Sequence, residues 1–391
     1  MNADAIGAFE RWETPFYYYD LQLLEGTLKQ VVGSASKRKY KVHYALKANA
    51  NPRLLTMIAG HGLGADCVSG NEIRCALDHG FAPETTVFAG IGKTDQEIRT
   101  ALEANIAVLN CESIEELKVV DALGRGMNCT AAVALRINPD VAAETHAKIT
   151  TGLAENKFGI GVEQLPEALE VLAQCPNLRL EGLHFHIGSQ IIQLSVFANL
   201  CQRINAVRAL LRDRGVQLRH LNAGGGLGVN YENPQREPIP NFEAYFGVFE
   251  RGLALEPGQE LHFELGRSIV AQCGSLVSRV LYTKEGAETT FAIVDAGMTE
   301  LLRPALYQSE HRIEALTCKA PTVNRYDVVG PICETSDTFG RQVPLPHIGR
   351  GNLLAIRTCG AYGEVMTSRY NLRDRAKSYF STQLTAARKA G

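Results

Sequence analysis

The chain has 391 residues, of which 45% are hydrophobic and 21% are charged, and its formal net charge is −2. A chain of this size can bury the core of a large domain and of a smaller one beside it. The near-balance of charges gives no electrostatic reason to expect a nucleic acid or a membrane surface as partner. No apolar run approaches the roughly 20 residues of a membrane span. Residues 1–20 lack the basic start and apolar middle of a signal peptide, so a cytoplasmic location is expected.

The ten cysteines form no C-x-x-C pair, and most of them lie inside apolar segments. Reduced thiols are therefore expected rather than a disulfide framework. No cluster of cysteine and histidine has the spacing of metal ligands, so we expect no metal site.

Short apolar runs with strand character recur between residues 42 and 270, and helical patterns fill the gaps. The eight runs are Val42–Ala48, Gly64–Val68, Thr86–Ala89, Ile106–Asn110, Ala131–Ile137, Leu180–Ile187, Leu218–Ala223 and Leu261–Val270. Three helical stretches begin with a capping-box pattern, which satisfies the first helical amides. The pairs are Ser69 with Glu72, Thr94 with Glu97, and Ser113 with Glu116. Strands that alternate with helices in this way predict an α/β fold with a (β/α)8 TIM-like barrel.

The rhythm changes after Ala271, where turn-rich sequence replaces full helices between the strand-like runs. These runs are Leu276–Tyr282, Thr290–Val294, Arg325–Val329 and Leu353–Arg357, and Phe16–Tyr19 has the same character. A second, β-rich domain is predicted. We place the barrel at residues 25–270 and the β-rich domain at 1–24 and 271–391. The tail 375–391 carries no recognisable motif and is expected to be a surface helix or mobile.

Polar and glycine residues follow the predicted barrel strands. They are Lys47, Asp66, Asn110, Arg136, His186, Ser189, the triplet Gly224, Gly225 and Gly226, Glu264 and Arg267. The active site of such a barrel lies at the carboxyl ends of its strands, so these side chains are expected at one rim. A lysine, a histidine, a glycine triplet and a Glu/Arg pair together indicate a charged ligand that bears a phosphate.

Each residue also has a plain structural interpretation. Lys47 by itself would be a surface lysine, and His186 a hydrogen-bonded core histidine. The glycine triplet would be a simple turn, and Cys333 an inert buried thiol. What favours a functional interpretation is the succession of motifs in which these residues occur.

The motifs run in order from about residue 15 to about residue 375. They are Tyr44–Asn49, His184–Gln190, Gly224–Gly228, Glu264–Arg267, Gly330–Glu334 and Cys359–Gly363. In this order they resemble the pyridoxal-5′-phosphate (PLP) decarboxylases of the alanine-racemase-like fold. The blocks His186–Gln190, Arg303–Tyr307 and Cys333–Glu334 are similar to those of the diaminopimelate decarboxylase sub-family. One departure is Leu265, where the family usually has proline.

The resemblance implies a role for each cofactor-site residue. Lys47 would form a Schiff base with PLP, His186 would stack on its ring, and Glu264 would sit against the pyridine nitrogen. The PLP phosphate would contact Gly224, Gly225, Gly226, Ser189 and the backbone of Gly266 and Arg267. Tyr362 would reach the cofactor from the second domain, with Asp66 and Arg136 in support.

The resemblance also implies substrate contacts. Arg267, Arg303 and Tyr307 match the positions that bind the substrate's distal carboxylate, and a guanidinium suits that group. Glu334 matches the residue that meets the distal ammonium, with Tyr362 beside the substrate. Cys333 matches the thiol proposed to protonate the carbanion after CO2 leaves.

The predicted reaction is decarboxylation of meso-2,6-diaminopimelate to L-lysine, the final step of lysine biosynthesis. The alternatives are a decarboxylase for ornithine, arginine or carboxynorspermidine, an alanine racemase, a non-catalytic PLP-binding homologue and a decarboxylase-like regulatory protein. Arg303 and Tyr307 argue against the other decarboxylases, and the presence of Lys47 and Cys333 argues against the regulatory protein. The resemblance further implies a homodimer in which each active site is shared between two subunits.

Overall fold

The computed structural model describes residues 3–141, 157–318 and 324–384. Its internal contacts divide the chain into two compact units. The barrel unit comprises Leu28–Gly228 and Asn241–Gly266, and the sheet unit comprises Met1–Thr27, Val229–Pro240 and Arg267–Gly391. Val229–Pro240 belongs to the sheet unit although it lies within the barrel sequence, and the sequence pattern did not predict this.

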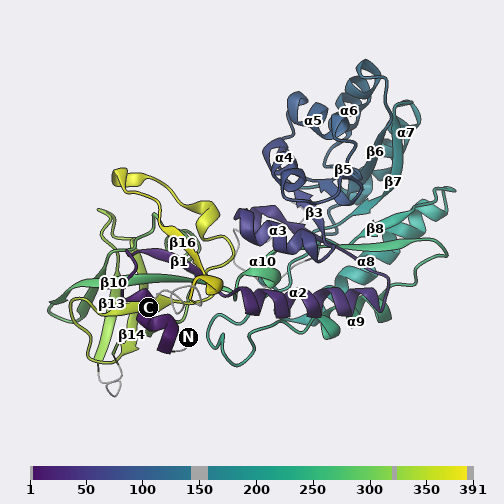
Figure 1. Cartoon of the computed structure of the whole chain (residues 1–391). Helices are drawn as coiled ribbons and strands as arrows, with labels where there is room; N and C mark the ends of the chain where they lie inside the picture. The colour runs from purple at the N-terminus through teal and green to yellow at the C-terminus, as the bar shows by residue number, and fades with distance from the viewer. Residues whose placement is uncertain (1–2, 142–156, 319–323, 385–391) are drawn as a thin grey trace. The chain divides into compact units, whose positions relative to one another are not determined.

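The barrel unit is built on a closed ring of eight parallel strands (Figure 1). They are β2 (Lys41–Ala45), β3 (Gly64–Cys67), β4 (Thr86–Phe88), β5 (Val108–Cys111), β6 (Ala131–Arg136), β7 (Leu178–His184), β8 (His220–Asn222) and β9 (Glu260–Leu265). Pairing of β2 with β9 closes the ring. The predicted (β/α)8 barrel is confirmed, and each strand overlaps one predicted run.

Helices connect the strands of the barrel. They are α2 (Leu21–Ser36), which begins in the sheet unit, α3 (Pro52–Gly60), α4 (Gly70–Asp78), α5 (Asp95–Glu103), α6 (Ile114–Gly126), α7 (Leu165–Ala173), α8 (Leu194–Arg212) and α9 (Phe242–Gly252). Side chains of Ser69, Thr94 and Ser113 accept the expected amide hydrogen bonds at the starts of α4, α5 and α6. Phe246 and Phe249 of α9 pack against Phe263 of β9 with ring centroids 4.9 and 4.8 Å apart, which fastens this helix to the barrel.

Three predicted strands, β2, β7 and β9, end at least three residues earlier than expected, and two of them are closely followed by a helix. After β2 the chain turns into a 3₁₀ helix, Leu46–Ala48, so Lys47 follows the strand instead of belonging to it. After β9 the helix α10 (Arg267–Val270) begins, so Arg267 opens a helix in the sheet unit. Apolar periodicity cannot separate a short buried helix from the end of a buried strand.

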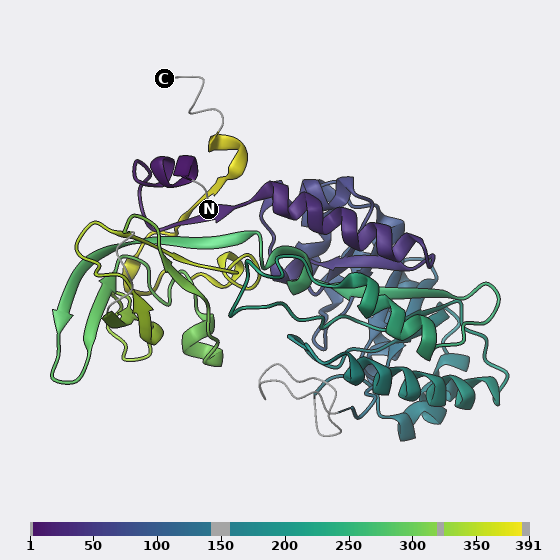
Figure 2. The same ribbon diagram turned by 90° about the horizontal axis from the view of Figure 1, so that it is seen from below.

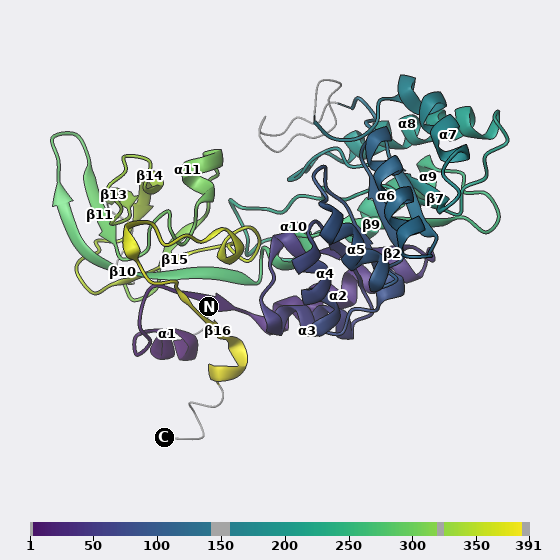
Figure 3. The same cartoon turned by 90° about the horizontal axis from the view of Figure 1, so that it is seen from above.

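The sheet unit holds eight strands in one mixed sheet (Figures 2 and 3). They are β1 (Phe16–Tyr19), β10 (Gly274–Glu285), β11 (Thr290–Val294), β12 (Ile313–Ala315), β13 (Asn324–Val329), β14 (Thr338–Leu345), β15 (Leu353–Ile356) and β16 (Lys377–Phe380). The long strand β10 pairs with β1, β11 and β15. The unit also contains α1 (Ala3–Phe9) and α11 (Arg303–Tyr307). The predicted β-rich domain is confirmed, although β12 and β14 were not anticipated.

The tail prediction is wrong for Lys377–Phe380, which forms β16 and pairs in parallel with β1. Tyr379 stacks on Trp12 at 4.1 Å and meets Phe16 edge-on, so aromatic packing holds this strand in place. Residues 385–391 of the predicted tail lie outside the described residues. Across the described part of the chain, no helix is long and apolar enough to cross a membrane.

Candidate active site

The amine of Lys47 lies beside a buried carboxylate. Its Nζ donates to Asp66 Oδ2 at 3.0 Å, and the Lys47 side chain is 35% exposed whereas that of Asp66 is fully buried. Burial, and then the charge of Glu264, raises the pKa of Asp66, while Lys47 opposes the rise. The Lys47 amine is therefore accessible to a ligand, and the buried carboxylate of Asp66 fixes its position.

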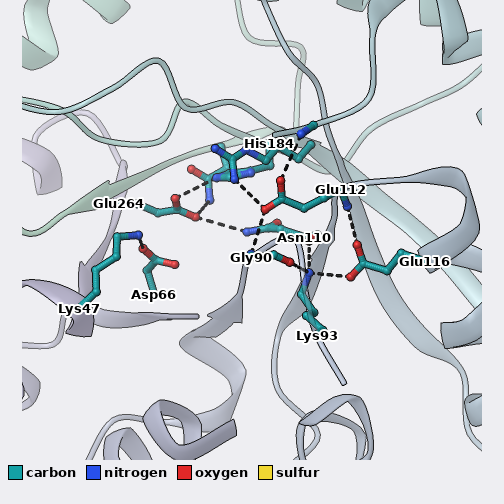
Figure 4. A network of polar contacts seen from close by, with 12 residues as sticks. Lys47, Asp66, Gly90, Lys93, Asn110, Glu112, Glu116, His184 and Glu264 are labelled. Atoms are coloured by element: carbon teal, nitrogen blue, oxygen red, sulfur yellow. Dashed lines mark hydrogen bonds and ion pairs between the residues drawn. The ribbon is translucent and has the colours of Figure 1, made fainter. Parts of the chain in front are cut away.

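Glu264 at the end of β9 is held by three side chains from other strands (Figure 4). His184 Nε2 donates to Oε2 at 2.9 Å, and Asn222 Nδ2 donates to Oε1 at 2.8 Å. Asn110 Nδ2 also donates to Oε1, at 3.3 Å. Burial alone would raise the pKa of Glu264, but His184 and Lys47 hold it well below its usual value. The carboxylate is thus ionised and held by donors from three other strands.

The glycine triplet packs against neighbouring backbone too closely for any side chain. A Cβ atom on Gly225 would lie 1.8 Å from the carbonyl oxygen of Glu264, and one on Gly224 would lie 2.1 Å from that of Phe185. Gly224 and Gly226 also have positive φ angles of 69° and 107°. The turn is therefore a bare backbone surface, the kind that admits a phosphate.

His186 lies next to this turn as a neutral ring. The amide of Gly225 donates to its Nδ1 at 3.3 Å, so that nitrogen carries the lone pair. Burial, together with the charges of Lys47 and Arg136, lowers the pKa of His186 well below its usual value. The segment that carries Ser189 runs beside the glycine turn, because Ile191 N bonds to Gly226 O at 2.8 Å.

A further layer of buried charges supports the barrel rim. Arg136 Nη1 pairs with Glu112 Oε1 at 2.7 Å, and Glu112 also accepts from the amide of Gly90 at 2.9 Å. Lys93 pairs with Glu116 at 2.6 Å and donates to the carbonyl oxygens of Gly90 and Asn110, both at 2.8 Å. Arg136 was expected at this rim, but its partner Glu112 and the Lys93–Glu116 pair were not predicted, and Glu116 was assigned only to a helix start.

In the sheet unit, two arginines converge on one tyrosine. Arg267 Nη1 and Arg303 Nη1 donate to the hydroxyl of Tyr231 at 2.6 and 2.8 Å. The Arg267 guanidinium also lies 4.8 Å from the ring centroid of Tyr362. Tyr307 closes the same short helix α11 that Arg303 opens. Sequence reasoning missed Tyr231, whose neighbours in Val229–Pro240 show no strand or helix pattern.

The Cys333–Glu334 segment is an exposed turn of the sheet unit. Of the ten cysteines, all within the described residues, Cys333 is the one exposed thiol, so the interpretation as a buried cysteine is wrong. Glu334 accepts from the hydroxyl of Tyr370 at 2.8 Å. The carboxylate of Asp337 accepts from the amides of Ile332 and Met298 at 2.7 and 2.6 Å, which pins the turn on both sides.

The predicted residues are divided between the two units. The barrel unit holds Lys47, Asp66, Arg136, His186, Ser189, Gly224, Gly225, Gly226, Glu264 and Gly266. The sheet unit holds Arg267, Arg303, Tyr307, Cys333, Glu334 and Tyr362.

Comparison with known proteins assigns the family. Residues 25–271 match the model of the pyridoxal-dependent decarboxylases, pyridoxal binding domain. A diaminopimelate decarboxylase of Bacteroides thetaiotaomicron is 52% identical to this chain, over 97% of the chain and 98% of that protein. The chain belongs to the pyridoxal-dependent decarboxylases, in their diaminopimelate decarboxylase group. PLP is the cofactor of this decarboxylase.

Solved structures of pyridoxal-dependent decarboxylases agree with the fold. The chain is similar to Helicobacter pylori diaminopimelate decarboxylase complexed with L-lysine, with a TM-score of 0.90 and 37% identity, covering 98% of this chain and 99% of that one. It is also similar to the M. jannaschii enzyme in co-complex with L-lysine, with a TM-score of 0.89 and 33% identity, covering 97% and 90% of the two chains.

The barrel unit of this decarboxylase has the groups that PLP needs. An amine for the aldehyde, an ionised carboxylate for the pyridine nitrogen and a neutral imidazole are all present, at Lys47, Glu264 and His186. The glycine turn packs against its neighbours too closely for a Cβ atom, so it consists of backbone without side chains. Oδ1 of Asp66 and Nδ1 of His184 are buried without hydrogen-bond partners among the described residues, so the polar capacity of this region is not used up by the chain.

Proposed function

We propose that the protein removes one carboxylate of meso-2,6-diaminopimelate as CO2 and leaves L-lysine, the last step of lysine biosynthesis. The observation that carries this proposal is the pair of guanidiniums, Arg267 and Arg303, which share one phenol oxygen in the sheet unit. Two guanidiniums suit the binding of the distal carboxylate, which is not removed in the reaction. Ornithine and arginine have no second carboxylate, so they would leave Arg267 and Arg303 without an anionic partner.

The barrel residues would hold the cofactor. Lys47 would bind it through its amine, oriented by Asp66 at 3.0 Å. Glu264 would keep a proton on the pyridine nitrogen, and His186 would cover one face of the ring. PLP, when bound, supplies a conjugated ring that accepts the electron pair left by departing CO2. The phosphate would lie against Gly224–Gly226, Ser189 and the backbone of Gly266 and Arg267.

The residues of the sheet unit would bind the substrate. Arg267, Arg303 and Tyr307 would bind the distal carboxylate, with Tyr362 beside it. Glu334 would meet the distal ammonium. After CO2 leaves, Cys333 or the Lys47 amine would return a proton to the same carbon. The thiol of Cys333 is exposed, so it is open to contact with another group.

We further propose a cytoplasmic homodimer with two shared active sites. Lys47, His186 and the Gly224–Gly226 triplet belong to the barrel unit, whereas Cys333 and Glu334 lie on an exposed turn of the sheet unit. An exposed turn is available to a second subunit, and a two-fold interface would place it in both sites at once.

The test is a screen for CO2 release by the purified, PLP-loaded protein. The substrates are diaminopimelate, ornithine, arginine and lysine at equal concentrations. We expect release from diaminopimelate with kcat/KM at least about a hundredfold above the others, because buried arginines left without their carboxylate are costly. Faster release from ornithine, arginine or lysine would overturn the proposal.

A further inference from the structure

Tyr231 lies at the centre of the cationic cluster in the sheet unit. Its hydroxyl accepts from Arg267 Nη1 at 2.6 Å and from Arg303 Nη1 at 2.8 Å. The two arginine residues are only 6% and 4% exposed, so neither guanidinium can relax into solvent. Tyr231 itself belongs to Val229–Pro240, a segment without helix or strand that joins the sheet unit from within the barrel sequence.

The hydrogen-bond capacity of this hydroxyl can be counted. A guanidinium has donors and no acceptor, so both contacts must be N–H groups pointing at the phenol oxygen. A phenol oxygen has two lone pairs and one hydrogen, and the two arginines occupy the lone pairs. The Tyr231 hydroxyl can therefore only donate a hydrogen bond to a third group. Both arginines can likewise only donate.

The positive charge of Arg303, beside Tyr231, is not balanced by a carboxylate among its described hydrogen-bond partners. Burial lowers the pKa of Arg303, and the charge of Arg267 adds to the effect. Its Nε is buried without a hydrogen-bond partner among the described residues. Such a group is stabilised by an arriving anion more than by any neutral ligand.

His311 supports the tyrosine ring without adding charge. Its ring meets that of Tyr231 edge-on, with centroids 4.9 Å apart. Nδ1 of His311 lies 2.9 Å from the carbonyl oxygen of Arg357 and so carries the hydrogen. Burial, and then the charge of Arg303, lowers the pKa of His311 to about 3. The ring stays neutral near pH 7, and the net charge of the cluster stays positive.

We propose that Tyr231 determines substrate specificity by aligning Arg267 and Arg303 and by donating its own hydrogen to the carboxylate that they bind. The ligand class is an α-amino-acid head group. This inference rests on the proposed function and deepens it. The carboxylate would accept hydrogen bonds from Arg267, Arg303 and the Tyr231 hydroxyl. The hydroxyl, which is neutral, also separates the two positive charges.

The experiment compares two ligands that differ by one carboxylate. L-Lysine and cadaverine share the same amine chain, and their dissociation constants for the PLP-loaded protein can be read from the cofactor absorbance. In Tyr231→Phe, we expect lysine to bind roughly ten- to a hundredfold more weakly, as for a lost hydrogen bond to a charged group. Cadaverine should change by no more than about twofold, and KM for diaminopimelate should rise more than kcat falls.

Tyr245→Phe is the matched control. Tyr245 is fully buried in the barrel unit, and its hydroxyl has no hydrogen-bond partner among the described residues. Removing that hydroxyl should leave the ratio of lysine to cadaverine affinity unchanged. Melting temperatures of both variants, each lacking a single oxygen atom, check that the fold is retained.

The outcomes separate the two claims. If the wild-type protein favours lysine over cadaverine and Tyr231→Phe keeps that preference, the role of Tyr231 is overturned and the proposed function stands. An equal loss of both ligands in Tyr231→Phe would also overturn it, since the effect would not concern the carboxylate. If the wild-type protein has no preference and releases no CO2 from diaminopimelate, the proposed function fails and the inference fails with it.

Discussion

Individual residues in this protein gain their chemistry from what surrounds them. Lys47 lies in a short 3₁₀ helix, and Asp66 fixes its amine from a position without solvent access. His186 would titrate near neutral pH in water, and here burial keeps it uncharged. Glu264 stays ionised because donors compensate its burial. In each case the neighbours, and not the residue type, set the charge.

The residue-scale prediction is that Lys47 carries PLP. The purified protein should be yellow, and borohydride should bleach the absorbance by reducing the bond between amine and cofactor. Peptide mapping of the reduced protein should locate the modification on Lys47. The Lys93→Gln variant serves as a control, because Lys93 is buried in an ion pair with Glu116 and should leave the modified peptide unchanged. A modification found on any other lysine would disprove the assignment.

At the scale of elements, four strand ends cooperate on one carboxylate. His184 ends β7 and Asn222 ends β8, while Glu264 and Asn110 are the last residues but one of β9 and β5. Oε1 takes two donors and Oε2 takes one, so Oε2 has a lone pair left for one more donor. These side chains can meet because the barrel is closed. Its strands all end at one rim, so residues far apart in the sequence lie close together there.

The element-scale prediction concerns His184, to which the sequence assigned no role. His184→Phe removes the donor to Oε2, so the carboxylate should hold a proton on the pyridine nitrogen less firmly. We expect kcat to fall by about ten- to a hundredfold, with PLP still bound. The ¹⁵N shift of labelled cofactor should move toward the unprotonated pyridine value. His347→Phe, at an exposed position, is the control. An unchanged ¹⁵N shift in His184→Phe would show that the other two donors suffice.

For the whole molecule, buried histidines predict sensitivity to mild acid. Burial lowers the pKa of His43, His186, His220, His262 and His311, and that of His220 falls to about 4. Unfolded histidines bind protons from about pH 6.5 downward, and these folded ones do not. Stability is therefore complete above about pH 6.5 and is lost as pH falls toward 4, by on the order of 3 kcal/mol for His220 alone.

The measurement is the urea midpoint at pH 7.5, 6.5 and 5.5, above the range in which most carboxylates titrate. We expect the midpoint to fall with each step. His220→Phe, which keeps a ring beside His262, should flatten the decline. A midpoint that stays level across the three values would mean that these histidines titrate alike in both states.

The second prediction at this scale concerns assembly. Lys47→Ala and Cys333→Ala should each be nearly inactive, yet activity should return when the two are unfolded together and refolded as a mixture. Random pairing makes about half of the dimers mixed, and each mixed dimer has one site free of both lesions. Recovery should thus approach about a quarter of the wild-type activity. If a mixture shown to contain heterodimers remained inactive, the shared site would be excluded. Mixing the folded variants without unfolding is the control and should restore activity more slowly.

The amino-acid pattern was sufficient for the barrel and for the rim at which most of the proposed cofactor residues lie. Strand and helix periodicities are local, so eight alternating runs indicated the ring without any knowledge of contacts. Lys47 and the glycine triplet closely follow barrel strands, Glu264 lies near the end of one, and the ends of parallel strands meet at one edge. Their place at a common rim thus followed from chain order.

Only the tertiary structure decided which buried groups pair. Tyr231 meets its two arginines across 36 and 72 residues of chain, and no local pattern marks such a contact. Likewise β16 depends on β1, which lies more than 300 residues earlier, and on the stacking of Tyr379 with Trp12. The sequence by itself determined the periodic elements and the motifs they carry, because these depend on neighbours along the chain. The hydrogen-bond partners of Glu264, Glu112 and Tyr231 depend on neighbours in space, which exist only once the chain has folded.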